Sequence, residues 1–386
     1  MNVARIILGL PHESDVYPGA PSGIDPNHEH PPLAKGIVAL SMFLLGDNGW
    51  GWRLPSVIFG TLSIVIFYLL VKKVSKNGLL SLISVFLFSF DNLVFVHSRI
   101  ATLDIFVLAF MLMGFYFYFD GRPILSALSL ALSTLCKIGG LYGFATIAVF
   151  HFVKVLVNAR SSGQKIDWQK HLGWLEKFVL VYGISSLGLL TVMDRWWGGY
   201  ANPFDHIAFI YEYTKALTRL VPEGIESYPW QWLLNEVKIP YLTVNVNILS
   251  DSTVTGSYTS VAFVGAMNEL GPVLIPVINR WFKIGPVISL CIPTIAYTGY
   301  LCYIKRSDVT LFTMVWFVCT YLPFYPMSLI GHRIMYLFYF LSTFPSLCIA
   351  VSNMIIDQKP PRIVVVIYLI AVIAGFINLF PFKTLP

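Results

Sequence analysis

The chain has 386 residues, of which 56% are hydrophobic and only 12% are charged, and its mean hydropathy is +0.70. Soluble globular proteins carry about a quarter of their residues as charged groups, so this composition excludes an ordinary water-exposed surface. The net charge of +6 is modest and the basic residues are dispersed between apolar runs, which argues against a nucleic-acid partner. The five cysteines have neither paired nor metal-type spacing, so no disulfide framework or zinc site is expected.

Ten apolar runs predict membrane spans. Backbone groups in lipid must be hydrogen-bonded within their own segment, so apolar runs that cross ~30 Å of hydrocarbon should be helices. The predicted fold class is therefore an all-α polytopic membrane protein, a bundle of about ten transmembrane helices with a large extracytoplasmic loop region. The expected spans are 53–72, 79–97, 102–119, 123–136, 139–157, 175–193, 286–304, 309–328, 333–355 and 362–381.

Two polar stretches interrupt these spans and divide the chain into four regions. Residues 1–52 form an extracytoplasmic first-loop remnant, in which the apolar segment 35–46 is too short to span and should lie at the membrane surface. Residues 53–193 form an N-terminal transmembrane core. Residues 194–285 form an extracytoplasmic loop rich in aromatic side chains, and 286–386 carry the C-terminal transmembrane helices.

The distribution of basic residues predicts the orientation. Most Lys and Arg residues between spans fall in one set of loops, which the positive-inside rule assigns to the cytosol. The short loops of the opposite face hold only Arg99, Lys137 and Arg333. Both long polar stretches share that opposite face. The active face is therefore expected to be extracytoplasmic, in the cell membrane of a prokaryote or the endoplasmic reticulum of a eukaryote.

The three cations on the depleted face are the first candidate site. Arg99, Lys137 and Arg333 each follow the end of an apolar run. If they converge, they would bind an anionic lipid head group such as a phosphate. The alternative is that each side chain reaches water or a phospholipid independently. The residues alone support these two interpretations equally.

Two acids lie near the same face. Asp91 lies within an apolar run, where an ionisable group is costly and often functional. Asp104 falls in the first turn of the next expected helix, where the helix dipole favours an acid and a purely structural role is the alternative. Either acid could pair with Arg99 and hold it in place.

Two further segments carry side chains that could bind a ligand. His28, Glu29 and His30 could contribute to a divalent metal site, although adjacent residues do not converge easily and a polar turn closed by two prolines explains them as well. In the aromatic loop, His206 and the pair Trp230 and Trp232 could stack on a sugar or hold an extended peptide. An interfacial aromatic belt is the alternative.

The order of these motifs resembles a known family. The segments 30–35 (HPPLAK), 51–55 (GWRLP) and 98–104 (SRIATLD), followed by 202–206 (NPFDH), 229–232 (PWQW) and Arg333 before Tyr336 and Tyr339, are similar to the protein O-mannosyltransferases. These are dolichyl-phosphate-mannose-dependent enzymes of the GT-C superfamily. The resemblance runs over most of the chain and rests on the ordered set of motifs, not on any one of them.

The resemblance implies a reaction and a donor substrate. Members of the family transfer a mannosyl (hexosyl) unit from polyprenyl or dolichyl phosphate to a Ser or Thr hydroxyl of a protein, with inversion. Arg99, Lys137, Arg333 and His30 would then bind the donor phosphate, and His206, Trp230 and Trp232 would contact the acceptor or the sugar. Asp91 would be a structural acid. Whether the protein binds a divalent metal and whether it forms a dimer stay open.

One family feature is missing from this sequence. The family carries an Asp-Glu pair in its first outer loop, after a first helix, and Met1 here is expected to fall inside that loop. The N-terminus therefore looks truncated, and Glu29 or Asp104 is the substitute candidate for the carboxylate that acts as base on the acceptor hydroxyl, with Glu13 and Asp15 as further options. The alternatives are a relative that glycosylates a lipid or a glycan, a lipid-sugar transporter, and an inactive homologue.

Overall fold

The structure is a computed structural model that describes residues 1–13, 15–234 and 291–379, together with 237, 239, 244–245 and 253–254. The described residues are predominantly helical. The α-helices are α1 Asn2–Leu8, α2 Leu33–Leu45, α3 Gly49–Ser75, α4 Gly78–Ser89, α5 Asn92–His97, α6 Asp104–Phe119, α7 Pro123–Cys136, α8 Leu141–Ser162, α9 Trp168–Met193, α10 Pro203–Ala216, α11 Pro229–Leu234, α13 Cys291–Ile304, α14 Asp308–Tyr321, α15 Phe324–Leu329, α16 Phe344–Gln358 and α17 Arg362–Leu379.

Short elements connect several of these helices. The 3₁₀-helices η1 (Ile138–Gly140) and η3 (Leu337–Ser342) precede α8 and α16, and the π-helix η2 (Asp194–Gly198) continues α9. A two-residue antiparallel pair joins β1 (Val244–Asn245) to β2 (Thr253–Val254).

The predicted class, an all-α polytopic membrane protein, is confirmed. Within the described parts of the chain, four helical stretches are long and apolar enough to cross a membrane, namely Gly49–Ser75, Ile138–Ser162, Trp168–Gly198 and Asp308–Leu329. Six shorter apolar helices accompany them. Residues 286–290 and 380–381 of two expected spans lie outside the described residues.

Two expected spans are interrupted. The run 79–97 divides into α4 and α5, because Asp91 accepts hydrogen bonds from the backbone N–H groups of Leu93 and Val94 and so begins a new helix. The run 79–97 was expected to be one helix, and it is instead two helices with Asp91 between them. The run 333–355 is helical only in η3 and α16, because Arg333 and Tyr336 form isolated β-bridges with the segment after α10.

Helix starts are encoded locally by short polar residues. The side-chain oxygens of Asn48, Asn77 and Asn202 each accept hydrogen bonds from two backbone N–H groups in the first turn of α3, α4 and α10. These donors have no partner within the helix, so a capping amide stabilises each start by about 1 kcal/mol. The cap at Asn202 sets where α10 begins, and α10 forms one wall of the site below.

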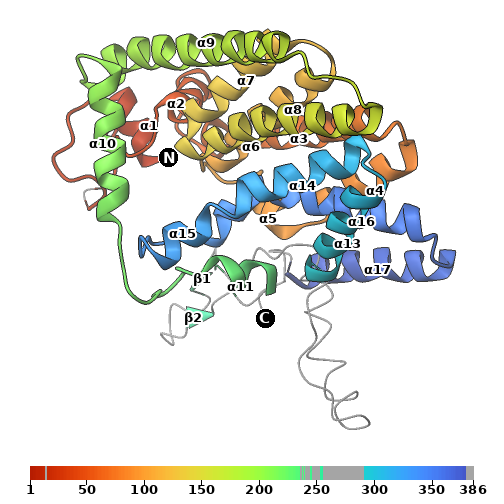
Figure 1. Ribbon diagram of the computed structural model, residues 1–386. Coiled ribbons are helices and arrows are strands. Elements are labelled where there is room, and N and C mark those ends of the chain that lie inside the picture. The colour runs from red at the N-terminus through yellow and green to blue at the C-terminus, as the bar shows by residue number, and fades with distance from the viewer. Residues whose placement is uncertain are drawn as a thin grey trace.

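Small residues allow the helices of the core to approach closely. A Cβ added to Gly114 of α6 would lie 2.6 Å from the Leu130 side chain of α7, and one added to Gly143 of α8 would lie 2.8 Å from the Met111 side chain. Close backbone approach is the usual basis of helix association in membranes. In Figure 1, α10 leaves the end of α9 and stands across one end of the bundle, beside the end of α15.

Ion pairs join helix ends at both faces. Lys73 pairs with Asp120 at 2.7 Å and Lys154 with Asp308 at 2.6 Å, at the helix ends that the basic residues assign to the cytosol. At the opposite helix ends, Lys137 pairs with Asp104. This last pair lies in the candidate site.

Candidate functional site

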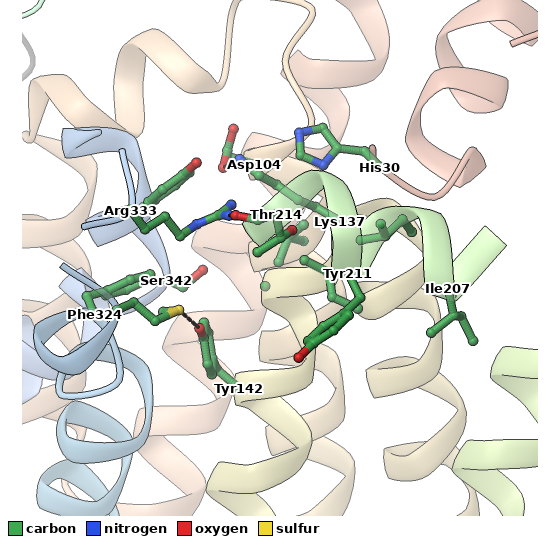
Figure 2. A pocket seen from close by; sticks show the side chains of 16 residues that line it. His30, Asp104, Lys137, Tyr142, Ile207, Tyr211, Thr214, Phe324, Arg333 and Ser342 are labelled. Atoms are coloured by element: carbon green, nitrogen blue, oxygen red, sulfur yellow. Dashed lines mark hydrogen bonds and ion pairs between the residues drawn. The ribbon is translucent and has the colours of Figure 1, made fainter. Parts of the chain in front are cut away.

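A cavity of about 320 Å³ opens where α10 approaches the bundle. One end is polar, with His30, Asp104, Lys137 and Arg333 directed toward one another in Figure 2. The rest is largely apolar and comes from η1, α8, α10, α15 and η3. Its lining includes Ile138, Tyr142, Ile207, Ile210, Tyr211, Phe324, Met327 and Tyr339. A largely apolar cavity with a cationic end suits an amphiphilic anion.

Lys137 is held firmly at the polar end. It ends α7 in an extended conformation, which turns its side chain out of the helix and toward the cavity. Its Nζ donates to Asp104 Oδ1 at 2.8 Å and lies 4.8 Å from the ring centroids of both Phe338 and Tyr339. Contacts with aromatic faces favour a cation, so Lys137 is ordered before any ligand arrives.

Arg333 is positioned mainly by backbone contacts. Its Nη1 donates to the carbonyl of Thr214 in α10 at 2.6 Å, and its own N–H donates to the Met327 carbonyl at 3.0 Å. An isolated antiparallel bridge pairs it with Thr218. Arg333 thus ties the end of α10 to the segment after α15, and it still lines the cavity.

His30 reaches the cavity from the loop before α2. Its Nδ1 is buried and has no hydrogen-bond partner among the described residues, which leaves this atom open to a ligand. Burial, together with the nearby Lys137 and Lys35 ammonium groups, lowers the pKa of His30 to about 3. The ring is therefore neutral near neutral pH and can take part in hydrogen bonding without adding charge.

The formal charge of the polar end is +1. Lys137 and Arg333 each contribute one positive charge, Asp104 contributes one negative charge, and His30 is neutral. A phosphodiester carries one negative charge, so the charges of the polar end and of a phosphodiester group are opposite in sign and equal in magnitude. This balance depends on Asp104, which partly neutralises the cation beside it.

The structure separates Arg99 from the other two cations. Arg99 follows α5, its guanidinium lies 4.9 Å from the ring centroid of Phe95, and it is not among the cavity-lining residues. The prediction that all three cations converge holds only for Lys137 and Arg333. Asp104 forms its ion pair with Lys137, so the expected pairing of Asp104 with Arg99 is not observed.

Two of the aromatic-loop candidates are structural. His206 is 1% exposed, with Nδ1 2.7 Å from Asp194 Oδ1 and Nε2 2.8 Å from the His28 carbonyl oxygen. Trp232 is 2% exposed, and its Nε1 donates to Ser227 Oγ at 2.9 Å. Neither can contact an acceptor, because burial and internal hydrogen bonds already engage them. Trp230 is half-buried and stacks on Tyr228 at 4.4 Å.

The segment 28–30 does not form a metal site in this arrangement. His28 contacts Tyr200, Glu29 accepts a hydrogen bond from Asn27, and His30 lines the cavity. Because the three side chains have different neighbours, they do not present a common set of ligands. Across the described residues, no group of three or more His, Cys, Asp or Glu side chains could hold a metal ion.

Several cavity residues were not expected from the sequence. Tyr142, Thr214 and Ser342 line the cavity from α8, α10 and η3, and Tyr142 donates a long hydrogen bond to the Met327 sulfur at 3.9 Å. Apolar runs with isolated hydroxyls are common in membrane helices, so no local signal marked these positions. Tyr339, by contrast, belongs to the motif around Arg333.

Comparison with solved structures defines the class of fold. The S. cerevisiae protein O-mannosyltransferase complex bound to its sugar donor superposes with a TM-score of 0.65 over 98% of this chain and 84% of that chain, at 11% identity. ArnT from Cupriavidus metallidurans bound to undecaprenyl phosphate gives a TM-score of 0.50 over 88% of this chain and 52% of that chain, at 15% identity. The chain therefore has the fold of the GT-C membrane glycosyltransferases.

Sequence comparison matches one part of the chain to a family. Residues 29–163 match the family model described as dolichyl-phosphate-mannose-protein mannosyltransferase. The polyprenol-phosphate-mannose--protein mannosyltransferase of Mycolicibacterium smegmatis is 33% identical over 86 residues, which is 22% of this chain and 17% of that protein. The resemblance predicted from the motifs is confirmed over residues 29–163. The matched segment spans about a sixth of that relative's length.

Proposed function

We propose that this protein is a membrane glycosyltransferase that takes a mannosyl (hexosyl) unit from a polyprenyl or dolichyl phosphate and transfers it, with inversion, to Ser or Thr hydroxyls of proteins. The observation that carries the proposal is the cavity with one cationic end and a largely apolar lining. The family match supports the choice of sugar donor, and the names of the relatives support a protein acceptor.

The polar end would act on the departing phosphate. Glycosyl transfer develops positive charge on the sugar ring and negative charge on the leaving oxygen. Lys137 and Arg333, which are already ordered by their own contacts, would stabilise that negative charge without reorganising at the moment of reaction. His30 would bind a phosphate oxygen or a sugar hydroxyl through its unpartnered Nδ1.

The acceptor side of the reaction is proposed from the sequence. Glu29, half-buried and adjacent to His30, is the candidate for the carboxylate that acts as a base and receives the acceptor proton. Asp104 is a weaker candidate, because its carboxylate already pairs with Lys137. Trp230 is the remaining aromatic candidate for contacting an acceptor peptide. The cavity would face the extracytoplasmic side, where the basic residues place the aromatic loop.

The proposal is tested with the purified full chain in detergent or liposomes. Undecaprenyl phosphate binding and the transfer of labelled mannose from polyprenyl-phosphate mannose to a Ser/Thr-rich peptide are measured together. Lys137→Met should weaken undecaprenyl phosphate binding about 10- to 100-fold, because a charge-assisted hydrogen bond contributes roughly 1.5–3 kcal/mol. Arg195→Met, a loss of an exposed cation away from the cavity, is the matched control.

The outcomes separate the alternatives. Transfer to a lipid or glycan acceptor, but not to the peptide, would favour the alternative that this protein glycosylates a lipid or a glycan. Donor binding that is insensitive to Lys137→Met and Arg333→Met would contradict the proposed site. Arg99 does not line the cavity, so Arg99→Ala should keep its affinity for undecaprenyl phosphate. A loss of affinity in this variant would instead support the three-cation site expected from the sequence.

A further inference from the structure

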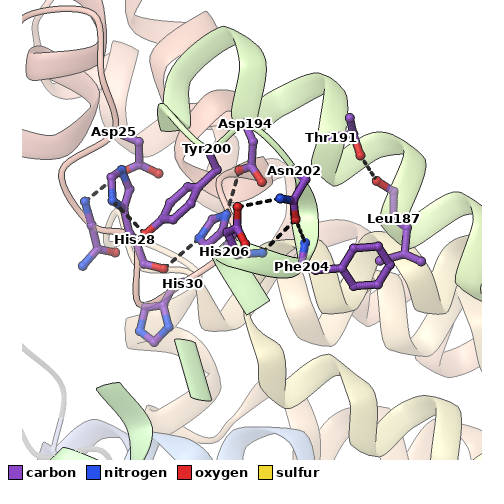
Figure 3. Close-up of polar contacts among 12 residues, drawn as sticks. Asp25, His28, His30, Leu187, Thr191, Asp194, Tyr200, Asn202, Phe204 and His206 are labelled. Atoms are coloured by element: carbon purple, nitrogen blue, oxygen red, sulfur yellow. Dashed lines mark hydrogen bonds and ion pairs between the residues drawn. The ribbon is translucent and has the colours of Figure 1, made fainter. Parts of the chain in front are cut away.

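A second buried polar cluster lies beside the cavity and has no role in the proposed reaction. It joins the loop 25–30 to the π-helix η2 and the first turns of α10 (Figure 3). At its centre, His206 and Asp194 are each about 1% exposed. The cluster spans segments about 180 residues apart in sequence, since His206 bonds the carbonyl of His28.

The hydrogen bonds of His206 require an additional proton. Both of its partners, a carboxylate oxygen at 2.7 Å and a backbone carbonyl oxygen at 2.8 Å, are acceptors. A neutral imidazole has one N–H and can donate to only one of them. With Asp194 ionised, both ring nitrogens must therefore carry protons, which makes His206 an imidazolium ion.

The surroundings stabilise that charged form. Asp194 supplies the opposite charge at hydrogen-bond distance, and the ring of Tyr200 stacks on the imidazole with a centroid distance of 4.5 Å and an interplanar angle of 6°. An aromatic face favours a cation. Burial lowers the pKa of the neighbouring His28, so this second ring does not compete for the proton. Among the described residues, the titratable groups in contact with His206 are Asp194, His28 and Tyr200, and Asp25 and Lys35 act on the neighbouring His28.

The bond from His206 to the loop bears on the position of His30. The Asp25 N–H donates to the Trp197 carbonyl at 2.6 Å, which gives a second link between the loop and η2. On the other side of the loop, Lys35 pairs with Asp25 and donates to the carbonyl of His30 at 2.7 Å. Residues 25–30 are thus held between α2 and η2, and His30 leaves this fixed loop toward Lys137.

We propose that the Asp194–His206 pair is a proton-dependent positioning device, which clamps the carbonyl of His28 and thereby sets His30 at the cationic end of the cavity. His206 is a positioning residue, because it touches neither the cavity nor a ligand within it. Loss of the shared proton leaves a single N–H for two acceptors. One of the two bonds then breaks, and the loop that carries His30 is released.

Asp194→Asn tests the proton specifically. An Asn side chain has nearly the same shape, and its amide N–H can donate to Nδ1 while Nε2–H still donates to the His28 carbonyl. The variant should therefore keep the clamp without the additional proton. It should bind undecaprenyl phosphate within about threefold of the unchanged protein at neutral pH.

His206→Ala removes the clamp at every pH and should weaken binding roughly tenfold, which corresponds to about 1.4 kcal/mol. Asp205→Asn is the matched control, because it removes an exposed acid one residue away. It should leave the affinity for undecaprenyl phosphate unchanged. An unchanged affinity in His206→Ala, or a loss in Asp194→Asn as large as the loss in His206→Ala, would overturn the proposal.

A direct measurement keeps this inference separate from the proposed function on which it rests. Selective ¹⁵N labelling of the eight histidines, with His206 assigned from the spectrum of His206→Gln, reports whether both ring nitrogens carry protons. Two protonated nitrogens at neutral pH, without any binding of undecaprenyl phosphate, would support the proton pair and contradict the donor site. One protonated nitrogen would overturn the pair whatever the protein binds.

Discussion

At the scale of single residues, charge balance is the property on which the cavity depends. Lys137 is buried enough for its ammonium group to need a partner, and Asp104 provides one at 2.8 Å. A lysine in this position without its carboxylate would be costly, because a buried charge is stabilised only by pairing and hydrogen bonds. The same pairing limits the cationic end to a single net positive charge.

Asp104→Asn should change which phosphate the cavity prefers. The substitution raises the charge of the polar end from +1 to +2. A phosphate monoester carries about −1.5 to −2 at neutral pH, while a phosphodiester carries −1. The variant should therefore tighten undecaprenyl phosphate binding relative to polyprenyl-phosphate mannose by roughly tenfold, or about 1.4 kcal/mol. Competition binding of the two lipids measures the ratio. An unchanged ratio would show that Asp104 does not set the charge preference.

His30 should make the protein less stable in acid. Its pKa is lowered to about 3 in the folded state, mainly by burial, while an unfolded histidine titrates near 6.5. The unfolded state therefore binds more protons between these values. The stabilisation is fully present above about pH 6.5 and is lost as the pH falls toward 3, by at most about 1.4 kcal/mol per pH unit. His30→Gln should flatten this fall in a thermal-denaturation series, and an unchanged slope would argue against a neutral, buried His30.

At the scale of elements, the turn after α7 aims Lys137 at the cavity. Gly140 packs directly on the last turn of α7, where an added Cβ would lie 2.4 Å from the Ser133 carbonyl carbon and the Thr134 nitrogen. Backbone atoms cannot move aside as a flexible side chain can. The adjacent Gly139 has nothing within 4 Å of an added Cβ. The two glycines therefore form a natural comparison.

Gly140→Ala should destabilise the protein by about 1–3 kcal/mol, which is typical of overpacking, and should weaken donor binding because Lys137 shifts with the turn. Gly139→Ala should leave the thermal midpoint nearly unchanged. Thermal unfolding and undecaprenyl phosphate binding are measured for both variants. Equal effects in the two variants would show that the close contact at Gly140 does not position the turn.

At the scale of the whole molecule, antiparallel helices place two sets of charged ends on opposite faces. Lys73 and Lys154 meet their acids at one face, and Lys137 meets Asp104 at the other. A single cysteine replacing Gln164 should be protected from a membrane-impermeant maleimide in sealed cells, and one replacing Glu223 should be labelled. A background in which the five native cysteines are replaced is required. Labelling in the reverse pattern would invert the proposed orientation.

The sequence by itself determined the membrane class, most of the helical spans and the unusual cations Lys137 and Arg333. Hydropathy and charge bias act along the local chain, because each span must satisfy lipid and orientation rules on its own. The ordered motifs also identified the family over the matched segment.

Only the tertiary structure decided how distant residues combine. It paired Asp104 with Lys137 and left Arg99 beside Phe95, and it buried His206 between Asp194 and the carbonyl of His28. Such pairings depend on which helix ends meet in space. Spacing along a chain cannot specify them, because partners such as His28 and His206 are joined only when α10 folds across the end of the bundle.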